Sequence, residues 1–124
     1  IDCTRASMKE KPQITEDEMY QLLRSQNIQE FNEKLEAGLP CDLTNCDFRS
    51  LDLRGINASN LNLRNAYFRN TDLRGIDLRT ADIEGATFAS AKISGCYFPD
   101  NISATEIQLS VEHGTRIRVI PVTK

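Results

Sequence analysis

Arginine and aspartate recur at fixed spacing between residues 41 and 100, and they are the groups of this chain best suited to binding a partner. Guanidinium groups in rows bind carboxylates, phosphates and acidic protein surfaces. The same pattern also suits a solvated surface on which arginine pairs with aspartate across neighbouring units, each pair contributing about 0–1 kcal/mol to stability. The arginines are Arg49, Arg54, Arg64, Arg69, Arg74 and Arg79, and the aspartates are Asp42, Asp47, Asp52, Asp72, Asp77 and Asp82.

We favour the solvated surface, because the aspartates follow the arginines so closely. A surface for a partner protein stays open as the alternative. Tyr67 and Tyr97 replace aspartate at outward positions on different sides of the expected fold, as contact residues or as ordinary surface aromatics. The candidate partner-binding residues are Arg49, Arg64, Arg69, Arg74, Arg79, Tyr67 and Tyr97.

No other group of residues in the sequence predicts a reaction. His113, the only histidine, stands at the end of an expected helix, where an imidazolium interacts favourably with the helix dipole. Cys41, Cys46 and Cys96 take a position that small apolar residues fill elsewhere, and their spacing is not that of a zinc site. We therefore expect no catalytic residue, no cofactor and no metal.

The repeated charges belong to a five-residue period that fills residues 41–100. The first residue of each unit is small or aliphatic, the third is Leu, Phe or Ile except at Ala58, and the fifth is a turn former. A short extended side followed by a corner explains this order. A helix does not, because a period of five leaves no constant face at 3.6 residues per turn. The units are CDLTN, CDFRS, LDLRG, INASN, LNLRN, AYFRN, TDLRG, IDLRT, ADIEG, ATFAS, AKISG and CYFPD.

Residues twenty positions apart should stack if four units close one coil. Phenylalanines separated by twenty indicate such a four-sided coil by themselves. With about 4.8 Å between neighbouring coils, three coils form a stack about 14 Å tall. The predicted inward columns are Phe48, Phe68 and Phe88; Leu53, Leu73 and Ile93; Leu43, Leu63 and Ile83; and Ala58, Leu78 and Phe98.

These units resemble the pentapeptide repeat family, whose consensus is roughly A-(D/N)-L-x-x. The resemblance covers sixty of the 124 residues, with departures at Ala58 and at the larger first residues Leu51, Ile56, Leu61 and Ile76. It implies a β-solenoid, a right-handed quadrilateral β-helix of about three coils.

Both ends of such a stack would expose unpaired backbone and apolar core, which solenoids cover with caps. Residues 15–40 are predicted to form an N-terminal helical hairpin. Its first helix begins with a Thr15–Glu18 capping box and an Ile14–Met19 hydrophobic staple. Its second helix is capped by Asn27. Residues 1–14 are a flexible lead-in, whose first seven residues could be an addition to the native sequence.

Residues 101–124 are predicted to form the C-terminal cap within the same single domain. A helix over 104–113 begins with a Ser103–Glu106 capping box and ends at Gly114. The tail that follows alternates like an edge strand. It either folds back along the helix or pairs with a second subunit, so a homodimer through the C-terminal segment is one expectation.

The composition favours a small cytoplasmic domain. The formal net charge of −3 is too mild to predict a nucleic-acid partner, and no apolar run is long enough to cross a membrane. No signal peptide is recognisable, and the cysteines do not form a disulfide pattern.

We therefore interpret the chain as a non-enzymatic module that binds or scaffolds another protein. The resemblance implies an alternative, because some pentapeptide repeat proteins mimic duplex DNA and bind DNA gyrase or topoisomerase. That role needs a long acidic rod, whereas this stack is short and its acids are compensated by arginine. An enzyme is the third reading, and nothing in the sequence argues for it.

Overall fold

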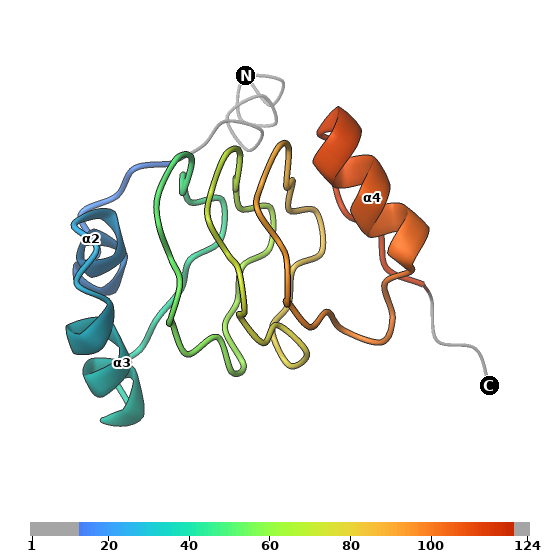
Figure 1. The fold of residues 1–124 in the computed structure, drawn as a ribbon. Helices are drawn as coiled ribbons and strands as arrows, with labels where there is room; N and C mark the ends of the chain where they lie inside the picture. The colour runs from blue at the N-terminus through green and yellow to red at the C-terminus, as the bar shows by residue number, and fades with distance from the viewer. Residues whose placement is uncertain (1–12, 121–124) are drawn as a thin grey trace, which may run out of the picture.

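The repeat region folds as a stack of coils that lies between two helices at one end and a third helix at the other (Figure 1). The structure is a computed structural model that describes residues 13–120. The first pair is α2 (Glu18–Arg24) and α3 (Ile28–Glu36), and the third helix is α4 (Ala104–His113). The expected lead-in is outside the described residues apart from its last two positions, 13 and 14.

Neighbouring coils are joined by isolated parallel bridges instead of continuous strands within the described residues. Each bridge of the repeat region links residues twenty positions apart, as the sequence periodicity predicts. At one of them, the Phe48 N–H donates to the Tyr67 carbonyl at 2.9 Å and the Tyr67 N–H donates to the Cys46 carbonyl at 3.0 Å. The bridged pairs are Asp42–Asn62, Asp47–Tyr67, Asp52–Asp72, Asn62–Asp82, Tyr67–Thr87, Asp72–Lys92 and Asp77–Tyr97.

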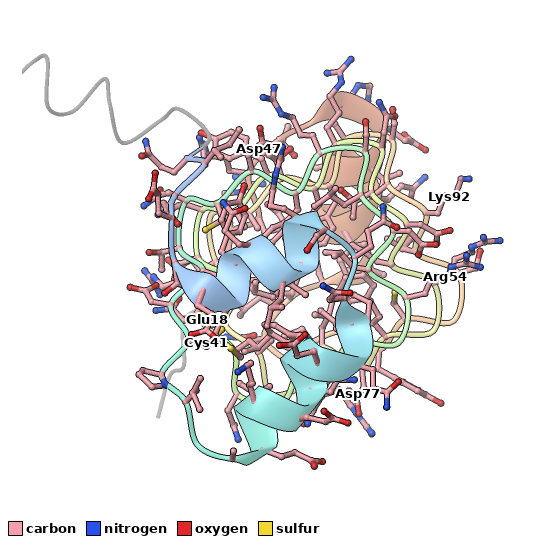
Figure 2. The ribbon with its side chains drawn as sticks, turned by 90° about the vertical axis from the view of Figure 1, so that its left-hand side faces the viewer. Glu18, Cys41, Asp47, Arg54, Asp77 and Lys92 are labelled. Carbon is pink, nitrogen blue, oxygen red and sulfur yellow. The ribbon has the colours of Figure 1, made fainter. Side chains whose placement is uncertain are left out.

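The bridges define four sides of the stack. Figure 2 looks along the stack from the α2–α3 end, with Asp47 on one side, Arg54 and Lys92 on the next, and Asp77 opposite Asp47. We call the side formed by residues 46–50, 66–70 and 86–90 the phenylalanine side. Asp47, Tyr67 and Thr87 are joined by bridges along it.

Phenylalanine rings stack at the centre of the molecule. The ring centroids of Phe48 and Phe68 are 5.3 Å apart, and those of Phe68 and Phe88 are 4.9 Å apart, with nearly parallel planes. Tyr20 meets Phe48 edge-on at one end, and Phe98 meets Phe88 edge-on at the other. In the remaining predicted columns Ile93 and Phe98 are partly buried, and the buried members are Leu43, Leu53, Ala58, Leu63, Leu73, Leu78 and Ile83.

The start of α2 differs from the expected capping box. Asp17, not Thr15, is the N-cap, and its carboxylate accepts from the Tyr20 N–H at 3.0 Å. Ile14 is 60% exposed and forms no staple. The reason is that Gln13 bridges to Cys46, which keeps the preceding chain extended and delays the helix.

The second helix begins and ends where the sequence predicts. Asn27 is the N-cap residue of α3, although its side chain makes no capping hydrogen bond. Gly38 has a φ of 92°, the left-handed conformation that follows many helices. The hairpin docks on the first coil through Asn32, whose amide donates to the Gly55 carbonyl and accepts from the Asn57 N–H.

The C-terminal helix spans the same residues as the expected helix, but only half of its capping box forms. The Ser103 hydroxyl accepts from the Glu106 N–H at 3.1 Å. The Glu106 carboxylate does not return the bond, because it binds Arg118 of the tail instead. The tail also pairs with the last coil, where Arg116 bridges antiparallel to Thr87. It therefore folds back along α4, as one of the two expected arrangements has it, and also lies against the repeat. Pairing with a second subunit stays a prediction.

Candidate interaction surface

Arginine and aspartate pair mainly within one unit. The pairing across units that the sequence predicts also occurs, since Arg54 Nε lies 3.4 Å from Asp72 Oδ2 of the next coil. In four units the fourth-position arginine donates to the second-position aspartate through its backbone N, Nε and Nη2. In one of them, Asp72 accepts from Arg74 Nε at 2.9 Å and from Arg74 Nη2 at 2.8 Å. The extended side of the unit places both side chains outward, two residues apart. The pairs are Asp47–Arg49, Asp52–Arg54, Asp72–Arg74 and Asp77–Arg79.

These pairs neutralise most of the repeated charge. Hydrogen bonds from the arginine lower the pKa of Asp72 and of Asp77 to about 2. The pKa of Asp47, which is buried, is also lowered, chiefly by the bond from Arg49. Each carboxylate therefore stays ionised next to its guanidinium across the ordinary pH range.

Arg64 has no aspartate in its own unit, because Asn62 stands in the second position. Its Nη1 instead reaches the next coil, where it lies 3.0 Å from Asp82 Oδ2 and 3.0 Å from Glu84 Oε1. Arg64 is thus neutralised between coils.

Arg69 is the exception among the candidate arginines. Tyr67 takes the place of aspartate in its unit, and Arg69 makes no salt bridge with any carboxylate of residues 13–120. Its side chain is exposed. Arg49 stands one coil away in the same position of the unit, so two guanidinium groups share this side and only one has a carboxylate.

A surface hollow of about 340 Å³ lies beside Arg69 on the phenylalanine side. Ala89 is small where the two preceding coils carry arginine, and this leaves space next to Arg69. The end of α4 contributes His113 and Gly114. The lining residues are Arg49, Tyr67, Arg69, Thr87, Ala89, His113 and Gly114.

Tyr67 is held in place by Arg116 of the tail. The Arg116 guanidinium lies 5.1 Å from the centroid of the Tyr67 ring, and its Nη2 donates to the Tyr67 hydroxyl at 2.6 Å. Its Nη1 donates to the Gly85 carbonyl at 2.9 Å. Arg116 is not among the candidate residues predicted from the sequence, because its position depends on how the tail pairs with the last coil.

The candidate residues do not form one surface. Arg49, Tyr67 and Arg69 lie together on the phenylalanine side, whereas Tyr97 and Arg79 meet on the opposite side, 4.7 Å from ring centroid to guanidinium carbon. Arg74 and Arg64 project from the two remaining sides, as their positions in the repeat require.

The remaining reactive groups are structural within the described residues. Burial raises the pKa of Cys41 to about 11 and that of Cys46 to about 12, so both thiols stay protonated. The Cys96 thiol donates to the Leu73 carbonyl at 2.8 Å. Among residues 13–120, no three His, Cys, Asp or Glu side chains gather as metal ligands. In the same range, no helix has the length and apolar composition needed to cross a bilayer.

Comparison with known proteins identifies the repeat itself. A family model described as pentapeptide repeats matches residues 41–79 and 62–98, with eight copies of the repeat. No curated protein and no solved structure gave a significant match.

Proposed function

Because the chain belongs to the pentapeptide repeat family, we propose that it is a non-enzymatic module that binds another protein through the phenylalanine side. We infer the right-handed quadrilateral path of that family for its coils, supported by bridges on all four sides. The free thiols of Cys41, Cys46 and Cys96 are compatible with the cytoplasmic location that the sequence predicts. A homodimer through the C-terminal segment stays a separate proposal.

The observation that carries the proposal is that Arg69, next to Tyr67, has no ion pair among residues 13–120. Arginine and tyrosine supply a large share of binding energy in protein interfaces. Arg74 and Arg79 already form ion pairs, so their burial in an interface would also remove those pairs from water. Arg69 has no such pair within the described residues, so it can form an ion pair with the partner without giving one up.

The coil stack holds these two side chains on a rigid base. Phe68, between them in sequence, is buried and stacked on both neighbouring rings. The backbone of Tyr67 is hydrogen-bonded to the coil before it, and that of Asn70 to the coil after it. A preorganised surface loses little conformational entropy on binding, which favours affinity.

A matched pair of tyrosine variants tests the proposal. Tyr67 and Tyr97 both occupy the second position of a unit and both lie under an arginine. The tagged wild type, Tyr67→Ala and Tyr97→Ala are used to capture proteins from the source cell, and the recovered proteins are quantified by mass spectrometry. We expect a protein that the wild type and Tyr97→Ala retain and Tyr67→Ala loses. Equal recovery by both variants, or no reproducible partner, would contradict the proposal.

Mimicry of duplex DNA is the weaker alternative. It is supported by the family resemblance alone, and the phenylalanine side carries more arginine than aspartate, opposite in sign to a DNA backbone. A gyrase supercoiling assay with the purified protein tests it, and inhibition at modest protein excess would favour this alternative.

A further inference from the structure

The hollow on the phenylalanine side carries an excess of positive charge that nothing in the described chain neutralises. Arg49 uses Nε and Nη2 to bind Asp47, which leaves its Nη1 without a partner among residues 13–120. Arg69 has no carboxylate at all within that range. Asp47 is the one acid of this side and is already bound to Arg49.

The groups at the end of the hollow do not cancel this charge. His113 Nε2 lies 4.0 Å from Glu112 Oε1, at the exposed end of α4. The Thr87 hydroxyl donates to the Gly114 carbonyl at 3.0 Å, which fixes the wall between the last coil and the helix. Arg116 contributes a further guanidinium behind Tyr67. Within the described residues, the guanidinium groups around the hollow (Arg49, Arg69 and Arg116) therefore outnumber the nearby carboxylates (Asp47 and Glu112), which favours an anionic ligand.

The spacing of the arginines suits a carboxylate. Stacked positions of neighbouring coils are about 4.8 Å apart. Guanidinium groups that extend from stacked positions repel each other, and an oxyanion that lies between them accepts a charge-assisted hydrogen bond from each. Arg49 has one donor nitrogen left for such a bond, and Arg69 has all of its donors.

We propose that the hollow binds the carboxylates of a short acidic segment of a partner protein, with Arg69 as the main donor and Arg49 as the second. This inference rests on the proposed function and specifies the chemistry of the partner. The hollow reaches across about two coil spacings, roughly 10 Å, which accommodates about three residues of extended peptide.

A nucleic acid fits this surface less well. Binding to a phosphate backbone gains its strength from many cationic contacts along the chain. Here one neighbouring side carries Asp42, Asp82 and Glu84 against a single cation, Arg64, and the whole chain has a net charge of −3. A long polyanion would extend past the hollow and meet these carboxylates, whereas a short acidic peptide would not.

Fluorescence anisotropy with a labelled hexaglutamate peptide tests the inference on the full-length protein. The control peptide is hexaglutamine, and the competitor is a short oligothymidylate. Arg69→Gln removes the main donor, and Arg79→Gln removes the same charge from the opposite side. Both side chains are exposed. The Arg69 side chain has no hydrogen bond or ion pair within residues 13–120 to lose, and its backbone bond from the Ser50 N–H is kept by any residue, so Arg69→Gln is expected to fold.

We expect hexaglutamate to bind the wild type, hexaglutamine not to bind, and Arg69→Gln to weaken binding about tenfold. Arg79→Gln should change the affinity less than twofold, roughly the effect of net charge alone. Equal losses in the two variants, no binding to the wild type, or tighter binding of oligothymidylate would overturn the inference. If one of these occurs while Tyr67→Ala still loses a captured protein, the acidic chemistry is wrong and the interaction function stands. If Tyr67→Ala also captures the same proteins as the wild type, the proposed function fails as well.

Discussion

Arg118 donates three hydrogen bonds to the carboxylate of Glu106, and this contact fastens the C-terminal tail to α4. The backbone N and Nε of Arg118 lie 2.9 Å and 3.0 Å from Glu106 Oε2, and Nη2 lies 2.9 Å from Oε1. These bonds hold the pKa of Glu106 below its usual range. The folded state thus binds this proton less readily than the unfolded chain. The Glu106–Arg118 ion pair therefore contributes its full amount to the free energy of unfolding above the pKa of Glu106 in the unfolded chain, about 4.3. This contribution is lost as the pH falls through the lower pKa of Glu106 in the folded state.

Glu106→Gln should therefore lower the Tm near neutral pH and have a much smaller effect in acid, once the pH is below the lowered pKa of the folded state. Thermal unfolding followed by circular dichroism between these conditions measures the difference. Glu112→Gln on the same helix is the control, since Glu112 is exposed and contacts only its neighbours Gln108 and His113 in the described chain. A loss of Tm that is the same at every pH would show that the ion pair is not its cause.

Phe68→Ala should be among the most destabilising single changes in the repeat. Phe68 contacts a stacked ring on each side, and its removal leaves a cavity at the centre of the column. We expect a loss of about 3–5 kcal/mol in the free energy of unfolding, measured by denaturant titration. Phe98→Ala at the partly buried end of the stack should cost less. Equal losses at the two positions would argue against a continuous central column.

Alanine substitutions at two corner glycines distinguish the cost of backbone strain from the cost of steric overlap. Gly75 and Gly85 both have a φ of 80°, so alanine at either position costs about 1–2 kcal/mol for the left-handed conformation. A Cβ at Gly75 meets no atom within 4 Å, whereas a Cβ at Gly85 would overlap the side-chain amide of Asn65. Gly85→Ala should therefore lower the free energy of unfolding more than Gly75→Ala does. The reverse order in a urea titration would contradict the placement of Asn65 over this corner.

The coil stack is predictable from the sequence because the contacts within it depend only on how many residues separate two positions along the chain. Residues separated by twenty, such as Phe48 and Phe68, must stack once four units form a coil, whatever the details of the corners. The range of α4 is equally predictable, because Ser103 and Gly114 mark its ends. The sequence also shows that Arg69 has no aspartate in its own unit, since Tyr67 stands in the second position. It does not show that Arg69 lacks an ion pair among residues 13–120, because Arg64, with Asn62 in the second position, pairs with the next coil.

The remaining features depend on packing between distant segments. Thr15 and Asp17 are both good N-caps, and the choice falls to Asp17 because Gln13 is held against the first coil. Arg118 binds the carboxylate of Glu106 because the tail pairs with the last coil. The residues around either position in the sequence do not predict that contact. Arg116 enters the candidate site for the same reason.

The contact between Tyr20 and the first coil is the last feature that sequence reasoning missed, and it gives a direct test of the N-terminal cap. Tyr20 is fully buried, its burial raises its pKa, and its hydroxyl donates to the Asp47 carbonyl at 2.7 Å. Tyr20→Phe keeps the ring against Phe48 and removes only the hydroxyl, so we expect a loss of about 1 kcal/mol in the free energy of unfolding. Tyr20→Ala also removes the ring and should cost about 3–5 kcal/mol, because it uncovers the end of the phenylalanine column. Tyr97→Phe, at a tyrosine that is 58% exposed, should leave stability unchanged. If Tyr20→Ala were as stable as Tyr97→Phe in denaturant titrations, α2 would not be closing the stack.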